Sequence, residues 1–160
     1  ILEENDVQIV LLGTGDAEFE DGFKHFAYQY PEKMAVSIAF DVKVAQLIYA
    51  GADMFLMPSA FEPCGLSQMI SMRYGTLPIV HEVGGLKDTV LPYNQYTGEG
   101  TGFGFDNFDS YYLRNTVSQA VSLFHNNKED WKKMQTQAML TDNSWQGSSD
   151  LYLDMFNQIS

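Results

Sequence analysis

The sequence predicts an α/β fold: a Rossmann-like, three-layer domain with a parallel sheet, followed by C-terminal helices. Two observations lead to this prediction. Four short apolar runs, each followed by a helical pattern, alternate over residues 7–90, and such alternation is typical of a doubly wound parallel sheet. From residue 109 onward only helical patterns occur, so helices are expected to close the domain.

The predicted strands are short runs rich in aliphatic and aromatic residues. Residues 7–12 (VQIVLL) are almost continuously apolar, as expected of a strand covered on both faces. Further strands are expected at residues 34–40, 54–57 and 77–80, with a short edge strand at 102–105. The sequence starts without Met and with a helix-like segment, so we expect that the chain begins inside a longer protein and lacks the first strand–helix unit of its domain.

The predicted helices lie between and after these strands. Pro31 ends the first helix, and Asp41 is placed to cap the second. The last helix follows Ser144 and Trp145, a capping sequence in which the Trp side chain is expected to be buried at the junction with the preceding helix. Most aromatic residues of the C-terminal part are likewise expected to pack between helices. The expected helices are residues 17–30, 42–50, 66–74, a short helix from 86, and 111–124, 128–139 and 148–159.

The composition is that of one folded domain of 160 residues, with 45% hydrophobic and 19% charged side chains. The net charge of −12 argues against binding to nucleic acid or to an anionic membrane, because both attract Lys and Arg. The single cysteine, Cys64, excludes an intrachain disulfide and is compatible with a reducing, cytoplasmic compartment. The apolar runs are shorter than the ~18 residues of a membrane helix. The scattered histidines show no metal-ligand spacing, so no metal site is expected.

The carboxyl ends of the predicted strands are where an open α/β sheet binds its ligands. At one of them, the sequence PSAFEPCGL leads directly into a helix. The first-turn N–H groups at Leu66, Ser67 and Gln68, with the helix dipole, form a seat for a phosphate. Gly65 permits close approach of a ligand, and Glu62 can accept hydrogen bonds from sugar hydroxyls. The alternative is that Glu62 is a solvated loop carboxylate and Gly65 a turn former.

Three further segments reach the same edge. Gly84 and Gly85 precede a helix, so their amides either face the same crevice or form a plain tight turn. Gly13 begins a GTGD loop that lacks the third glycine of a dinucleotide fingerprint. Phe40 either stacks on a base or packs in the core.

His81 is interpreted as a loop histidine without a catalytic role, and Cys64 as a small thiol beside the ligand rather than a nucleophile.

Several motifs occur in one order and at one spacing over almost the whole chain. They are GTGD at residues 13–16, FEPCGL at 61–66, MRYGTLP at 72–78, GGLKDTV at 84–90 and GTGF at 100–103. In this order and spacing, they resemble the bacterial glycogen synthase and plant starch synthase family.

The resemblance implies the C-terminal half of a GT-B fold, with residues 1–160 as the nucleotide-sugar-binding domain. It implies a retaining glycosyltransferase that moves glucose from ADP-glucose to the non-reducing end of an α-1,4-glucan, without a metal or cofactor. The glucan acceptor would be held by the missing N-terminal domain. Glu62 matches the essential glutamate that contacts the donor glucose. The positions that match donor-binding residues are Gly13, Ala39, Phe40, Cys64, Gly65, Leu66, Ser67, Gly84 and Gly85.

Some positions depart from the family pattern. Val83 stands where the family usually has Thr, and Ala60 replaces a common Arg. Ile70 stands eight residues after Glu62, where many other retaining GT-B families have a second glutamate that this family commonly lacks. The Arg and Lys that neutralise the diphosphate in the family have no counterpart here, so the chain alone is expected to be inactive. Two alternatives stay open: a GT-B transferase that uses UDP-glucose, and a non-enzymatic α/β binding module.

Overall fold

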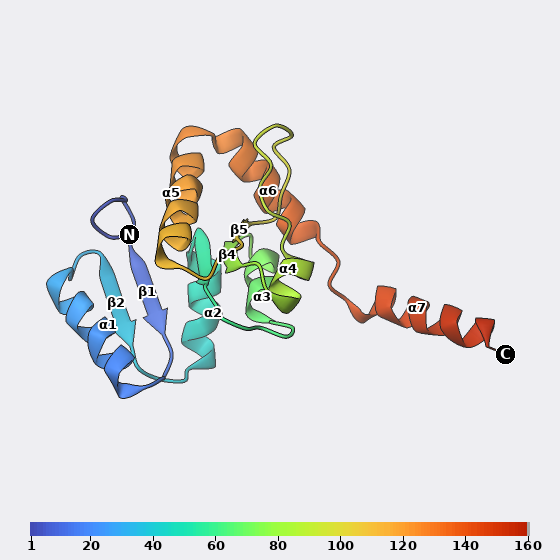
Figure 1. Cartoon of the computed structure of the whole chain (residues 1–160), viewed down its shortest axis with the longest axis horizontal. Helices are drawn as coiled ribbons and strands as arrows, with labels where there is room; N and C mark the ends of the chain where they lie inside the picture. The colour runs from blue at the N-terminus through green and yellow to red at the C-terminus, as the bar shows by residue number, and fades with distance from the viewer. Residues whose placement is uncertain (160) are drawn as a thin grey trace.

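The computed structural model describes residues 1–159 and confirms the predicted α/β class. Strands and helices alternate through the first two thirds of the chain, and helices alone follow (Figure 1). The strands are β1 (Ile9–Leu12), β2 (Met34–Ser37), β3 (Met54–Met57), β4 (Leu77–His81) and β5 (Phe103–Phe105). The helices are α1 (Ala17–Gln29), α2 (Val42–Gly51), α3 (Ser67–Arg73), α4 (Gly84–Thr89), α5 (Ser110–Asn126), α6 (Lys128–Leu140) and α7 (Trp145–Gln158).

All strand pairs are parallel, but they form two sheets rather than the single sheet that was expected. β1 pairs with β2, and β3, β4 and β5 form a second sheet in that order. In the usual order of a doubly wound sheet, the first strand is central, with the second and third on one side and the fourth to sixth on the other. The two sheets thus have the order expected of a doubly wound sheet without its central strand.

The hydrophobic core lies around β4, which is buried at every position. Helices α3, α4, α5 and α6 all contact this strand. The largest cluster of buried side chains joins β4 and β5 to α3, α5 and α6, with Leu77, Phe103 and Trp131 among its members. Each such side chain contributes about 1.5–3 kcal/mol when it is fully buried. This core fixes the carboxyl ends of β3 and β4, from which two of the candidate loops emerge.

The unit formed by β1, α1 and β2 is less buried. Met34 is its one core residue, and α1 and α2 contain no buried residue within the described chain. The N-cap prediction for Asp41 is confirmed, because its Oδ1 accepts hydrogen bonds from the Lys43 and Val44 N–H groups at 2.9 and 3.0 Å. β2 ends at Ser37, so the prediction that this strand continues to Phe40 is wrong.

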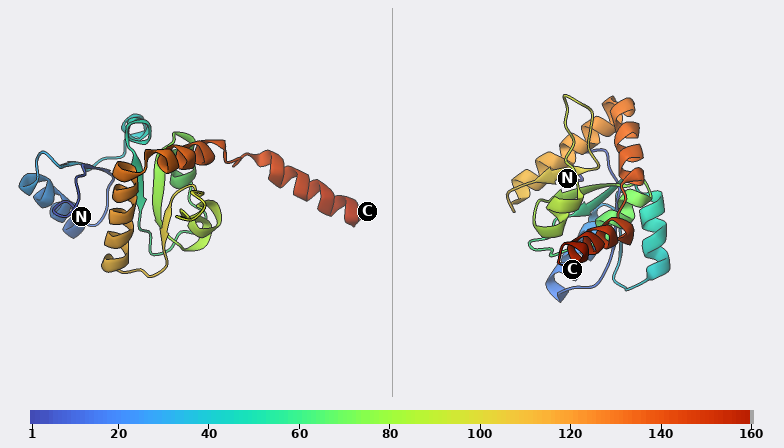
Figure 2. Two further views of the ribbon diagram at one scale, coloured as in Figure 1. Left: turned by 90° about the horizontal axis from the view of Figure 1, so that it is seen from above. Right: turned by 90° about the vertical axis from the view of Figure 1, so that its right-hand side faces the viewer.

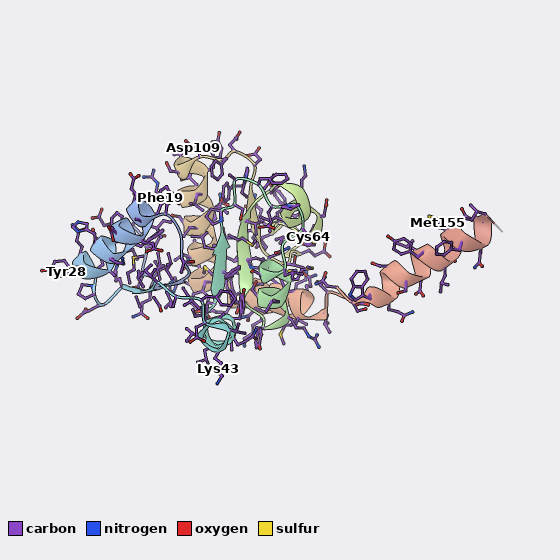
Figure 3. All side chains as sticks on the ribbon, turned by 90° about the horizontal axis from the view of Figure 1, so that it is seen from below. Phe19, Tyr28, Lys43, Cys64, Asp109 and Met155 are labelled. Carbon is purple, nitrogen blue, oxygen red and sulfur yellow. The ribbon has the colours of Figure 1, made fainter. Side chains whose placement is uncertain are left out.

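Helix α7 projects away from the rest of the chain (Figures 1 and 2). Met155 lies far from the labelled side chains of the sheet region (Figure 3). Ser144 caps the helix, but Trp145 is 83% exposed, so the prediction that it buries the joint is wrong. Tyr152 and Phe156 are also exposed, and α7 contains no buried residue. No helix within residues 1–159 combines the length and the apolarity that a membrane span requires.

Candidate functional site

The loop after β3 and the turn after β4 form one unit. The Gly85 N–H donates a hydrogen bond to the Glu62 carbonyl oxygen at 3.1 Å. A Cβ at Gly84 would overlap that same oxygen, and Gly84 has a φ of +48°, where side chains are strained. The two glycines therefore permit backbone contact between the loops, which places Glu62 and Cys64 directly beside the start of α4.

A buried glutamine holds this unit together. Gln68 is 0% exposed, and its Nε2 donates to the carbonyl oxygens of Gly65 and Cys64 and to Thr89 Oγ1, at 2.9, 3.2 and 3.0 Å. The Thr89 hydroxyl in turn donates to the Gly85 carbonyl at 2.6 Å. The side chain of Gln68 thus links the loop after β3 to Thr89 of α4, and Thr89 in turn links it to the turn after β4 through Gly85.

The sequence interpretation assigned only the N–H of Gln68 to the site and missed this role of its side chain. The spacing of residues along the helix could have indicated that the Gln68 side chain is buried. Gln68 stands three and four residues before Ser71 and Met72, which are also fully buried. A long amide on the buried face of a short helix needs partners, and the adjacent loops supply them. Its Oε1 is buried without a hydrogen-bond partner among the described residues.

The start of α3 is exposed at some positions only, and Gly65 is buried. Gly65 has a φ of +73°, which explains the glycine at the turn into the helix. Leu66 is 67% exposed, and Cys64 is also exposed. Glu62 and Ser67 are half-buried. Within the described residues, no side-chain hydrogen bond caps the start of α3.

The amides of the turn after β4 are hydrogen-bonded within the protein. The Gly85 N–H is bonded to Glu62, and the Leu86 N–H donates to the Val83 carbonyl at 3.1 Å. The Leu86 hydrogen bond is that of a tight turn, whereas the Gly85 hydrogen bond joins this turn to the loop after β3. Their hydrogen bonds are used to hold the loops together, and Gly85 is buried while Gly84 is exposed.

His81 is the last residue of β4 and is buried, so the prediction that it lies in a loop is wrong. Its Nδ1 lies 2.8 Å from the Ser59 carbonyl oxygen, so this nitrogen carries the proton and donates. The ring is 8% exposed and packs against Phe105 and Phe108, with centroid distances of 5.4 and 5.2 Å. These contacts hold the loop after β3 against the end of β4.

The other pair of loops lies at the ends of β1 and β2. The Gly13 N–H donates to the Ser37 carbonyl at 3.2 Å, which continues the parallel pairing. Ala39 is half-buried. Phe40 is 91% exposed, so the core role that was considered for it is excluded. A Cβ at Gly13 or Gly15 would meet no atom within 4 Å, so no described neighbour requires these glycines.

The structure thus brings the predicted site residues together in two groups. Glu62, Cys64, Gly65, Leu66, Ser67, Gly84 and Gly85 form one group, and Gly13, Ala39 and Phe40 form the other. No hydrogen bond joins the two groups within the described part of the chain. Arg73 is the only Lys or Arg within residues 44–86, and it donates to the Met139 carbonyl at 2.7 Å, while Lys87 follows in α4. Among residues 1–159, no three His, Cys, Asp or Glu side chains are placed to hold a metal ion.

Comparison with known proteins gives a consistent result. The family model described as "Glycosyl transferases group 1" matches residues 1–138. Glycogen synthase of Streptococcus mutans is 57% identical over 155 residues, and that of Ligilactobacillus salivarius is 58% identical over 158 residues. These alignments cover 97% and 99% of this chain but 33% of each relative, so the chain spans about a third of their length.

Solved structures show the same relationship. The catalytic domain of starch synthase IV from Arabidopsis thaliana, bound to ADP and acarbose, matches with a TM-score of 0.83 and 30% identity. The match covers 94% of this chain and 32% of that one. Sucrose-phosphate synthase from Thermosynechococcus elongatus, at 20% identity, TM-score 0.65 and coverage of 95% and 38%, shares the fold. The fold is therefore that of a GT-B glycosyltransferase domain, and the chain belongs to the family of group 1 glycosyl transferases.

Proposed function

We propose that this chain is the donor-binding part of a cytoplasmic glycogen or starch synthase. The full protein would transfer glucose from ADP-glucose to the non-reducing end of an α-1,4-glucan, with retention and without a metal or cofactor. The observation that carries the proposal is the FEPCGL loop, which the Gly85 N–H holds against α4 through the Glu62 carbonyl. The loop lies in a chain that is 57% identical to a glycogen synthase over 155 residues. The structural similarity to a starch synthase bound to ADP supports the same donor.

Each part of the site has a role in this proposal. The first-turn amides at Leu66 and Ser67 receive the diphosphate, because the first turn of a helix offers N–H donors at the positive end of its dipole. The Glu62 carboxylate accepts hydrogen bonds from hydroxyls of the donor glucose. Cys64 and Gly65 line the sugar end. This group orients the glucose and the leaving diphosphate relative to each other.

The second group holds the nucleoside. The exposed ring of Phe40 stacks on adenine, because an unpaired aromatic face gains apolar contact when a base covers it. The backbone of Gly13 and Ala39 borders the base. Gly84 closes the sugar side. The open arrangement of the two sheets agrees with a central strand, supplied by the rest of the protein, that brings the two groups together.

The isolated chain should not catalyse the transfer. Negative charge develops on the leaving diphosphate, and cations normally stabilise it. No Lys or Arg lies within residues 44–72 or 74–86, which contain the first group of loops. The loss of two cation contacts and of the facing acceptor domain would raise the barrier by more than about 4–5 kcal/mol, or roughly a thousandfold in rate. Measurable glucan elongation by the 160-residue chain would contradict this part of the proposal.

A donor competition assay on the full-length protein tests the substrate assignment. With glycogen as the acceptor, ADP-glucose should be used in preference to UDP-glucose, and EDTA should leave the rate unchanged. Equal use of both donors, or a preference for UDP-glucose, would favour another GT-B transferase. A protein that binds nucleotide but transfers no glucose would instead be a binding module.

A further inference from the structure

Gln68 is a polar side chain that is fully buried against the loop after β3. Its Nε2 donates to the carbonyl oxygens of Cys64 and Gly65, whereas its Oε1 is buried without a hydrogen-bond partner among the described residues. An apolar side chain of similar length would fill the same space without an unpaired acceptor, so packing alone does not account for an amide at this position. The hydrogen bonds to the two carbonyl groups indicate a different role.

These two carbonyl groups determine where the adjacent N–H groups point. The described chain contains no cis peptide bond, and in a trans peptide the C=O and the N–H of the next residue point in opposite directions. Because the Cys64 and Gly65 carbonyls point toward the buried amide, the N–H groups of Gly65 and Leu66 point away from it. Neither N–H donates a hydrogen bond to any residue within 1–159, so both keep their capacity to bind a ligand.

The backbone at Gly65 and Leu66 has the form of an anion-binding turn. Gly65 has a φ of +73°, and Leu66 follows in the right-handed helical region with a φ of −107° and a ψ of −31°. Successive residues of opposite handedness direct their N–H groups toward one concave point, where an anion binds. A Cβ at Gly65 would overlap Gln68 Oε1 and lie 2.8 Å from Nε2, so the glycine also leaves room for the amide.

The same amide reaches the turn after β4. Helices α3 and α4 lie side by side (Figure 1), and Gln68 Nε2 donates to Thr89 Oγ1 at 3.0 Å. The Thr89 hydroxyl donates to the Gly85 carbonyl oxygen, while the Gly85 N–H donates to the Glu62 carbonyl oxygen. The loop after β3 is thus held at Glu62 and at Gly65 by one chain of hydrogen bonds. Donors that are fixed in this way need little reorganisation when negative charge develops beside them.

We propose that Gln68 is a positioning residue, which holds the N–H groups of Gly65 and Leu66 in the orientation that binds the diphosphate of the donor. The identity of this ligand rests on the proposed function. Gln68 is 0% exposed, so it acts through the two peptide groups and not by contact with the donor. Its loss should therefore impair the use of the donor and leave the use of the glucan acceptor unchanged.

Kinetics and ADP binding of the full-length protein test this role. Gln68→Met keeps the length of the side chain and removes the amide. It should weaken ADP binding about tenfold and lower kcat/KM for ADP-glucose at least as much, while the KM for glycogen stays the same. The matched control is Met72→Val, because Met72 is equally buried on α3 but packs in the hydrophobic core. This variant should lose stability and keep the wild-type kcat, KM values and ADP affinity.

Circular dichroism at the assay temperature separates loss of fold from loss of position. A folded Gln68→Met protein with wild-type ADP affinity and kcat/KM would overturn the proposal, and so would an equal loss in Met72→Val. If Gln68→Met does not fold, Thr89→Val tests the same hydrogen bonds. It should weaken ADP binding about threefold, and unchanged affinity would overturn the proposal.

The two proposals can fail separately. A protein that transfers glucose from ADP-glucose equally well with Gln68→Met contradicts the positioning role alone. A protein that binds ADP more weakly with Gln68→Met, but transfers no glucose as the wild type, contradicts the proposed function alone.

Discussion

The contact between Gly85 and the FEPCGL loop gives a prediction that is independent of any ligand. In Gly85→Ala, the new Cβ would lie 2.6 Å from both the carbonyl carbon and the Cα of Cys64, and it would overlap the Cys64 carbonyl oxygen. These are backbone atoms, so the loop must move. Overpacking of this kind costs about 1–3 kcal/mol, and the loss of the Gly85 N–H bond to Glu62 costs about 1 kcal/mol more. The gain in helix propensity of alanine over glycine offsets about 1 kcal/mol.

The net expectation is a loss of about 2 kcal/mol in the free energy of unfolding, or a Tm lower by about 4–8 °C for a chain of this size. Urea unfolding followed by circular dichroism measures it. The matched control is Gly22→Ala in α1, where a Cβ meets no atom within 4 Å and stability should rise by about 0.5–1 kcal/mol. If Gly85→Ala is as stable as the wild type, the two loops are not in the contact described here.

Three further predictions concern stability. Asp41→Ala should lower the free energy of unfolding by about 1 kcal/mol, because the Asp41 carboxylate caps α2. Asp16→Ala should lower it by almost nothing, because Asp16 makes no cap hydrogen bond, and equal losses in urea unfolding would contradict this reasoning. Gln68→Leu should cost about 2–4 kcal/mol by leaving buried partners without a donor, and the exposed Gln146→Ala should be neutral in the same assay. Burial and a neighbouring carboxylate raise the pKa of Tyr93 to about 12, so its stabilising effect is complete below pH ~10 and disappears as the pH rises toward 12. Tyr93→Phe should therefore flatten the loss of stability between pH 10 and 12, and an unchanged alkaline unfolding curve would contradict the assignment.

Local sequence signals predicted the elements that depend on neighbouring residues. The alternation of strands and helices and the cap at Asp41 both follow from chemistry within a few residues. The position of α7 and the exposure of Trp145 could not be predicted in this way, because burial depends on what the helix packs against. The division of the sheet was missed for a similar reason, since pairing partners are distant in sequence.

The sequence predicted which residues belong to the candidate site, but it did not predict the hydrogen bonds between them. The sequence located both amide-bearing turns, and the structure brings them together through Glu62 and Gly85. It did not show that the Gly85 and Leu86 N–H groups are bonded within the protein, or that Gln68 links the loops. Backbone hydrogen bonds between two loops depend on tertiary packing, and no local pattern in the sequence encodes them.

The central claim is that these loops bind the donor glucose and diphosphate. The most direct test is the rate at which the full-length protein transfers labelled glucose from ADP-glucose to glycogen, measured for the wild type, for Glu62→Ala and for Glu32→Ala, an exposed carboxylate outside both groups of loops. Glu62→Ala should lower the rate roughly a thousandfold or more, while Glu32→Ala keeps the wild-type rate. Wild-type transfer by a folded Glu62→Ala protein would contradict the account.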